Sequence, residues 1–229
     1  MVIPERAFSQ IRFERDNVIV EIVKDLMKVD VKLCRLEGRQ KMTPFHHAAI
    51  RGRAEVIGLM LSGCPDCIED ETERRENALH LAVRNNRFEA IKMLVDWNRE
   101  MNKEYLLNKK HEQGNTALHL ASWKKTRPGN KFFSYLLPVQ FPVIEDLLGS
   151  INVSPGFLEV NAGNHSGLTP LSTAYFTKRR DREIIEILLG AGAMKARDIY
   201  FNQNPFGTST TIETWQSQPD NMVEYFQIS

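Results

Sequence analysis

The sequence predicts an all-α solenoid of stacked helix-turn-helix repeats. Two observations support this prediction: a six-residue block recurs along the chain, and an apolar segment with helical spacing follows each copy. The four copies start 34, 39 and 53 residues apart, at residues 43–48, 77–82, 116–121 and 169–174. The apolar segments that follow them begin at Ala54, Phe88, Phe141 and Arg182.

The blocks resemble the ankyrin repeat, whose signature T-P-L-H-x-A recurs about every 33 residues. The first three blocks, TPFHHA, NALHLA and TALHLA, match this signature well. The resemblance implies that the Thr or Asn opening each block caps the first helix of a repeat, because its side-chain oxygen can accept a backbone N–H of the first turn. It also implies that Leu or Phe at the third position fills the layer between repeats.

The family prefers glycine two residues before the cap, where the backbone makes a left-handed turn. The residues at this position are Lys41, Arg75, Gly114 and Gly167. Two of the four depart from glycine, so we expect their hairpins to be modestly looser.

We assign residues 18–196 to the repeat domain, with a partial repeat at 18–40 and full repeats near 41–74, 75–113, 114–166 and 167–196. The segment from Val20 aligns without gaps to the segment from Ala54, but its own first helix is missing or unrecognisable in the sequence. A solenoid repeat buries its apolar face only against its neighbours. We therefore expect Ile22, Val23 and Leu26 to be partly uncovered unless residues 1–17, predicted to be irregular, fold over them, and we expect this end to fray.

The third repeat carries an insertion of 14 residues, 126–139, between its two helices. The segment combines a loop signal at residues 128–130 with an apolar cluster at residues 132–137, which a solvated loop does not favour. Residues 197–229 are predicted to form an irregular tail.

Composition excludes several classes of protein. The chain has 229 residues, a net charge of +1 and 42% hydrophobic residues, as in an average globular protein. The near-zero charge gives no bulk attraction to nucleic acid, so we expect no nucleic-acid partner. Three cysteines are too few for a disulfide scaffold. The sequence shows no signal-peptide core and no segment that could span a bilayer, so we predict a cytoplasmic protein.

We predict no enzymatic activity, no cofactor and no metal site. The C-x-x-C pair Cys64 and Cys67 lacks a second ligand pair, and it follows a helix instead of a strand. His46, His80 and His119 belong to different repeats, and the resemblance implies that each bonds locally to hold a turn. The sequence GAGA from Gly190 also follows a helical pattern, so it is not a dinucleotide loop.

The resemblance implies a protein partner, bound on a concave surface built from hairpin tips and first helices. The candidate partner-binding residues at the tips are Gln40, Lys41, Met42, Arg74, Arg75, Glu112, Gln113, Asn164 and His165.

A second surface is a basic ridge at the turns between the two helices of each repeat. Its residues are Arg51, Arg53, Arg84, Arg87, Lys124, Lys125, Arg127, Lys178, Arg179, Arg180 and Arg182. Solvated turns are often rich in Lys and Arg without any partner. The alternative is peripheral binding to an anionic membrane surface, where each nearby cation adds on the order of 1 kcal/mol.

A narrower resemblance rests on the sequences LVDWNREMN and GNTALHLASWKK, and more weakly on NMVEYFQIS near residue 229. They are similar to plant ankyrin proteins that carry a C-terminal membrane-spanning PGG domain. The resemblance implies a role in signal transduction or plant defence, in a family whose full-length members are anchored in a membrane. This sequence contains no PGG segment, so we expect a form without the membrane anchor that contacts the plasma membrane only peripherally.

Overall fold

The computed structural model describes residues 5–123, 158–176 and 182–203. These residues form α-helices and short 3-10 helices, and they contain no strand. The α-helices are α1 (Glu5–Val29), α2 (Pro44–Arg51), α3 (Ala54–Gly63), α4 (Ala78–Arg84), α5 (Phe88–Glu100), α6 (Ala117–Trp123), α8 (Pro170–Phe176), α9 (Arg182–Gly190) and α10 (Ala196–Gln203). The 3-10 helices span Val31–Arg35, Arg39–Lys41, Pro65–Glu69 and Glu104–Asn108.

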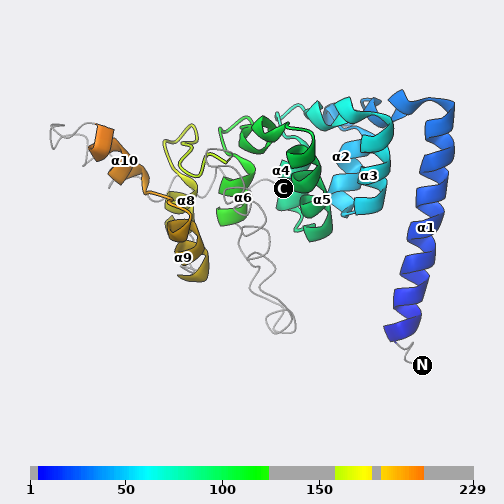
Figure 1. Ribbon diagram of the computed structural model, residues 1–229, viewed down its shortest axis with the longest axis horizontal. Coiled ribbons are helices and arrows are strands. Elements are labelled where there is room, and N and C mark those ends of the chain that lie inside the picture. The colour runs from blue at the N-terminus through cyan, green and yellow to red at the C-terminus, as the bar shows by residue number, and fades with distance from the viewer. Residues whose placement is uncertain (1–4, 124–157, 177–181, 204–229) are drawn as a thin grey trace.

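The helices stack in two layers along one axis (Figure 1). The first layer holds α2, α4, α6 and α8, each of which contacts the next. The second layer holds α1, α3 and α5, which also contact one another in order. Helices α2 and α3, α4 and α5, and α8 and α9 form the pairs that join the layers. The predicted all-α solenoid is therefore confirmed.

The predicted caps are present at the start of each first-layer helix. The side-chain oxygens of Thr43, Asn77, Thr116 and Thr169 each accept a hydrogen bond from the backbone N–H three residues later. The third residue of each block packs between the layers, because Phe45, Leu79, Leu118 and Leu171 are all buried. Local capping and burial of one apolar face together explain why each block becomes the first helix of a repeat.

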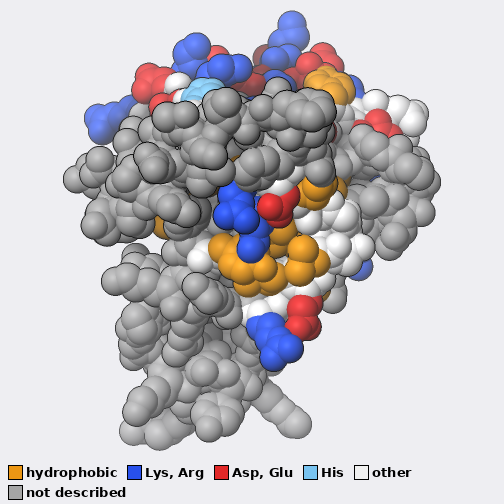
Figure 2. Space-filling view, turned by 90° about the vertical axis from the view of Figure 1, so that its left-hand side faces the viewer, with side chains coloured by type: hydrophobic (Ala, Val, Ile, Leu, Met, Phe, Trp, Pro, Cys, Tyr) orange, Lys and Arg blue, Asp and Glu red, His pale blue; other side chains and the backbone are white. Residues whose placement is uncertain are grey.

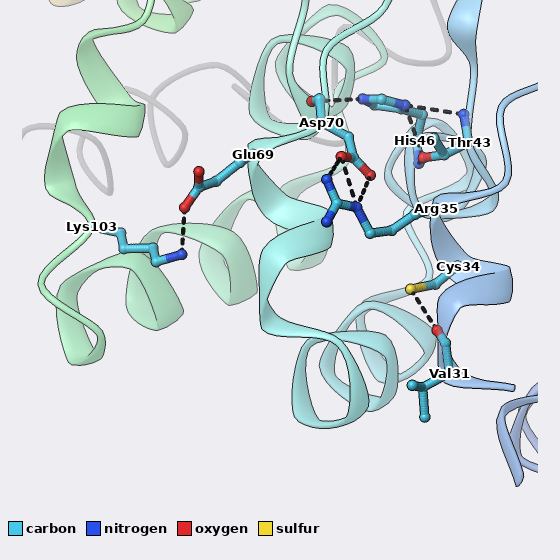
Figure 3. Close-up of polar contacts among 8 residues, drawn as sticks. All are labelled: Val31, Cys34, Arg35, Thr43, His46, Glu69, Asp70 and Lys103. Carbon is cyan, nitrogen blue, oxygen red and sulfur yellow. Dashed lines mark hydrogen bonds and ion pairs between the residues drawn. The ribbon is translucent and has the colours of Figure 1, made fainter.

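Each block histidine bonds to its own cap and also to a carbonyl further along the chain, as Figure 3 shows for His46. The backbone N–H of Thr43 donates to Nδ1 of His46 over 3.1 Å. Because Nδ1 accepts, the ring proton lies on Nε2, which donates to the carbonyl of Asp70 over 3.1 Å. His80 and His119 repeat this arrangement toward the carbonyls of Asn115 and Leu168. The prediction of structural histidines is confirmed, and the bonds of His80 and His119 extend into the next repeat.

Two segments predicted to be irregular are helical. Residues 5–17 belong to α1, which runs without interruption to Val29. Residues 197–203 belong to α10. Neither helix contains Gly or Pro, so nothing in the local sequence breaks it, and charged residues interleaved with apolar ones are compatible with a helix. The insertion 126–139 and residues 204–229 lie outside the described residues.

The expectation of uncovered apolar residues in the partial repeat is confirmed. Ile22 and Leu26 are about half exposed, whereas Val23 is partly buried against the core. The adjoining 3-10 helix holds the partial repeat to the next one through Arg35, whose Nη2 lies 2.6 Å from Oδ1 of Asp70 (Figure 3).

Candidate functional site

Four hairpin tips precede the four blocks, at residues 38–42, 72–76, 111–115 and 164–168. In each tip the first backbone N–H donates to the last carbonyl, over distances between 2.8 and 3.1 Å. The same geometry therefore recurs four times, although the sequences of the tips differ.

The tips are also joined to one another. The backbone N–H groups of Glu73, Glu112 and His165 donate to the carbonyls of Gln40, Arg74 and Gln113, over 3.0, 2.9 and 3.2 Å. Each bond joins one tip to the next, so the tips form a continuous row. The structure thus brings the predicted tip residues together along one edge of the solenoid.

A left-handed residue occurs in every tip, at the predicted position. The φ angles are 54° at Lys41, 57° at Arg75, 77° at Gly114 and 72° at Gly167. The turn therefore forms with or without glycine. In the first tip Gln40 is left-handed as well, with φ of 58°.

The predicted tip residues differ in exposure. Gln40, Lys41, Arg75, Glu112 and His165 are exposed, and Met42, Arg74 and Gln113 are partly buried.

Asn164 is buried and holds its own tip. Its Oδ1 accepts from the backbone N–H groups of Ser166 and Leu168, and its Nδ2 donates to Oδ1 of Asn115 over 2.7 Å. The bonding of this side chain is therefore structural.

The first-layer helices add side chains that were not predicted to bind a partner at the tips, although Arg51 was named in the basic ridge. His47 and Arg51 of α2 are exposed, and Ile50 of α2 and Leu120 and Trp123 of α6 are partly buried. They occupy the variable position of the block and the following turn of the helix. These residues could have been found from sequence variation among the repeats. The block is otherwise repetitive, and it changes at the positions that do not face the core.

A partly buried ion pair lies beside the tip row. The carboxylate of Glu76, only 4% exposed, pairs with the guanidinium of Arg84 from α4. Burial raises the pKa of Glu76, and the positive charges of Arg84 and Arg74 oppose that shift. Because a buried carboxylate needs a fixed partner, this pair holds Arg84 in place beside the tips. The sequence reasoning missed Glu76 and placed Arg84 in the basic ridge.

The described members of the basic ridge have different surroundings. Nε of Arg87 donates to the carbonyl of Ile50 over 2.8 Å, and Nε of Arg182 lies 2.9 Å from a carboxylate oxygen of Glu186. Arg53 is partly buried and Arg51 is exposed. The remaining members, Lys124, Lys125, Arg127, Lys178, Arg179 and Arg180, lie outside the described residues.

Three buried histidines lie in the second and third repeats: His80 in α4, His111 in the third tip and His119 in α6. Burial lowers the pKa of His80 to about 4, of His119 to about 4 and of His111 to about 3. His111 accepts a hydrogen bond at Nδ1 from the backbone of Gln113, and its ring lies 5.7 Å from that of His80. These rings are neutral near pH 7. In the part of the chain that the structure describes, no group of His, Cys, Asp and Glu is arranged to hold a metal ion.

The cysteines are part of the packing between the partial repeat and the first full one. Cys34 and Cys67 are buried in the core, and Cys64 is partly buried. Sγ of Cys34 donates to the carbonyl of Val31 over 3.0 Å (Figure 3). Burial raises the pKa of Cys34 to about 12 and also raises that of Cys67. These thiols are therefore poor nucleophiles near pH 7.

The C-terminal end of the solenoid differs from the tip row. Figure 2 views the molecule from this end and shows hydrophobic side chains gathered at the centre, with basic and acidic side chains beside them. Leu189 of α9 is half exposed, and Nζ of Lys195 lies 4.1 Å from the ring centroid of Tyr175. Apolar and charged groups therefore meet at this end.

Among the described residues, no helix is both long and apolar enough to cross a membrane. Comparison with curated proteins found no match. Residues 14–105 match the family model described as "Ankyrin repeats (3 copies)". Repeats of this type are typically non-catalytic modules that mediate protein–protein interaction. The chain contains ankyrin repeats, and its fold is that of an all-α ankyrin solenoid.

Proposed function

We propose that this chain is a non-catalytic adaptor that binds a protein partner across its tip row and the exposed side of its first-layer helices. The observation that supports this proposal is the set of backbone hydrogen bonds between successive tips. These bonds fix the spacing of side chains from different repeats before a partner arrives. A preorganised surface loses less entropy on binding than one that must be ordered.

The charges on this surface suggest the chemistry of the partner. Lys41, Arg51 and Arg75 are exposed on the first two repeats, and Glu73 is an exposed acidic residue beside them. Leu120 and Trp123, which are partly buried, lie on α6 further along. We infer that the partner presents acidic side chains to the N-terminal half of the surface and apolar or aromatic ones to α6. Complementary charge would steer the encounter, and apolar contact would slow dissociation.

A peptide-display selection tests this function. The full chain is immobilised, and a library of random peptides is selected against it. The tip variant is Lys41→Glu, Arg51→Glu and Arg75→Glu combined. The control variant reverses three exposed charges away from the tips, Lys32→Glu, Lys92→Glu and Arg197→Glu, and therefore changes the net charge equally.

We expect peptides with acidic residues beside aromatic ones to be enriched on the wild type and on the control variant, and to be lost from the tip variant. Equal enrichment on all three proteins would contradict the proposed surface. The circular dichroism spectrum of each variant establishes that it is folded.

The biological setting that we propose is plant signalling or defence, at the cytoplasmic side of the membrane. Its support is the resemblance of LVDWNREMN and GNTALHLASWKK to the PGG-domain group. A defence phenotype in plants that lack the protein, restored by the wild type and not by the tip variant, would join this setting to the tip surface. Restoration by both proteins would show that the defence role does not depend on the tip surface.

Binding to an anionic membrane surface is the second candidate function, and Arg51, exposed on the basic ridge, is the residue that favours it. Against it, Arg84 and Arg87 engage groups of the protein itself. Sedimentation with vesicles containing phosphatidylserine tests this candidate, because electrostatic binding weakens steeply with added salt. Absence of the protein from the pellet at low salt would dismiss it.

A further inference from the structure

The first helix leaves an apolar stripe uncovered. Val18, Ile22, Leu26 and Val29 are exposed by 58%, 53%, 50% and 81% of their surfaces. Their spacing of four, four and three residues places them on one side of α1. A continuous exposed stripe of this kind marks a contact surface more often than scattered single residues do.

The neighbouring side of α1 is already occupied by the solenoid. Val23 and Met27 are partly buried against the core, and α1 packs on α3. Cε of Met27 comes so close to Gly63 that a Cβ added there would lie 2.5 Å away. The stripe is therefore not the side that binds the rest of the chain.

The next repeat shows how the corresponding positions of a second-layer helix are covered. The alignment of α1 with α3 matches Ile22 and Leu26 to Val56 and Met60, which are only 4% and 5% exposed. Helix α3 has a first-layer partner, α2, packed against it. Figure 1 shows α1 at the end of the stack, with part of it projecting past α3 and no described helix on its outer side. The stripe lies open where an antiparallel helix would complete the repeat.

The charges beside the stripe are arranged in a way that favours pairing with an identical helix. Exposed Glu21, Lys24, Asp25 and Lys28 lie along one border of the stripe, with ion pairs of 2.7 Å and 2.9 Å within the helix. An antiparallel copy related by a two-fold axis between Lys24 and Asp25 would place Glu21 opposite Lys28 and Lys24 opposite Asp25. The same operation places Ile22 and Leu26 of the two copies together.

We propose that two copies of this chain associate through the outer side of α1, as an antiparallel helix pair about a two-fold axis. Each α1 then takes the place that a first-layer helix would fill, which no helix among the described residues occupies in the other copy. An interface of this type is self-complementary, so one surface patch suffices for both partners. The direction of the pair matches that of two consecutive helices joined by a short turn.

Another occupant would be the chain's own residues 204–229. This segment contains Glu213, Asp220 and Glu224 and no Lys or Arg. It therefore offers no cation to Glu21 and Asp25, whereas a second copy of α1 offers both signs of charge. Charge complementarity thus favours the second copy.

The test uses two complementary variants and light scattering coupled to size-exclusion chromatography. In Glu21→Lys with Asp25→Lys, all four charges are positive, and in Lys24→Glu with Lys28→Glu, all four are negative. We expect the wild type at about 100 µM to have twice the 26.4 kDa mass of one chain. Each variant alone should have the mass of one chain, and an equimolar mixture should recover the doubled mass.

The mixture controls for folding, because a misfolded variant could not recover pairing. A further variant, Ile22→Lys, should abolish the doubled mass, and Leu189→Lys, at an equally exposed leucine of α9, should retain it. A wild type with the mass of one chain at about 100 µM would overturn the proposal. So would a mixture that stays monomeric. The proposal would also be overturned if the backbone amide of Ile22 were protected from hydrogen exchange in the full chain and lost this protection when residues 204–229 are deleted. That result would identify the tail as the occupant.

Discussion

The first two tips and the last two tips share one backbone turn but differ in the residue that makes it. Lys41 and Arg75 adopt φ angles of 54° and 57°, where a side chain is strained, whereas Gly114 and Gly167 adopt 77° and 72°. A Cβ at Gly114 would lie 2.5 Å from the backbone nitrogen of His165 in the next tip. Glycine is required there for close packing as well as for the backbone angle.

The comparison shows that the two halves of the tip row obey different constraints. The first two tips carry long basic side chains at the strained position, at a cost on the order of 1 kcal/mol each. The last two tips carry no side chain there and approach one another closely. If the tip row binds a partner, only the first two tips can contact it with a side chain at the left-handed position.

The largest effect that would separate the two halves is acid destabilisation of the second and third repeats. His80, His111 and His119 have pKa values lowered to about 4, 3 and 4 by burial, from an ordinary value of 6.5. A group whose folded pKa is depressed below its unfolded value binds protons preferentially in the unfolded state. Their neutral state therefore adds stability above pH 6.5 that is lost as the pH falls toward 4.

The expected loss at pH 5 is about 2 kcal/mol for each of these histidines. Hydrogen exchange followed by mass spectrometry between pH 7.5 and 5, corrected for the intrinsic exchange rate, measures it. The tips at residues 111–115 and 164–168 should lose protection before the tip at residues 38–42. Simultaneous loss at all tips would contradict this difference between the halves.

Gly114→Ala should give the next largest effect, a loss of about 3 kcal/mol of unfolding free energy. The added methyl group meets the backbone of the next tip, which cannot rotate away, and the backbone angle is unfavourable for alanine. Urea unfolding measures the loss. The matched control is Gly163→Ala, where a Cβ would meet nothing within 4 Å and the change should stay within about 0.5 kcal/mol. Equal effects of the two substitutions would show that close packing is not the constraint.

His119→Ala should cost about 2 kcal/mol. The substitution removes a buried ring that joins the third repeat to Leu168 of the next tip over 2.9 Å, and it leaves that carbonyl without this donor. The exposed His165 provides the control, since its replacement by alanine should change the urea midpoint little. A loss no larger than that of His165→Ala would mean that the bond to the next tip contributes nothing.

Arg75→Gly should give the smallest effect and the opposite sign, a gain of about 0.5 kcal/mol. Relief of the left-handed strain, about 1 kcal/mol, exceeds the added entropy that glycine gives the unfolded chain. A higher urea midpoint, together with weaker peptide binding in the display experiment, would show that Arg75 is retained for its side chain. A lower midpoint would mean that the Arg75 side chain stabilises the fold.

The prediction of residues 5–17 and 197–203 as irregular shows where sequence reasoning was incomplete. Both segments lie beyond the block pattern, and the search for blocks gave no signal for them. Their helices follow from the simpler observation that neither contains Gly or Pro. The helical conformation of α1 could therefore be predicted from the sequence. The exposure of the stripe formed by Val18, Ile22, Leu26 and Val29 could not, because it depends on which helices lie beside α1.

The sequence by itself determined the local features of this protein. Thr43 caps its helix, Arg75 adopts a left-handed turn, and the His46 ring accepts from the backbone of Thr43, because each interaction joins residues a few positions apart. Only the tertiary structure decided that Glu76 is buried against Arg84 and that the Asn164 side chain bonds Asn115. The physical reason is that burial and charge pairing depend on neighbours from other helices and repeats, whereas capping and turn geometry are settled within a few residues of chain.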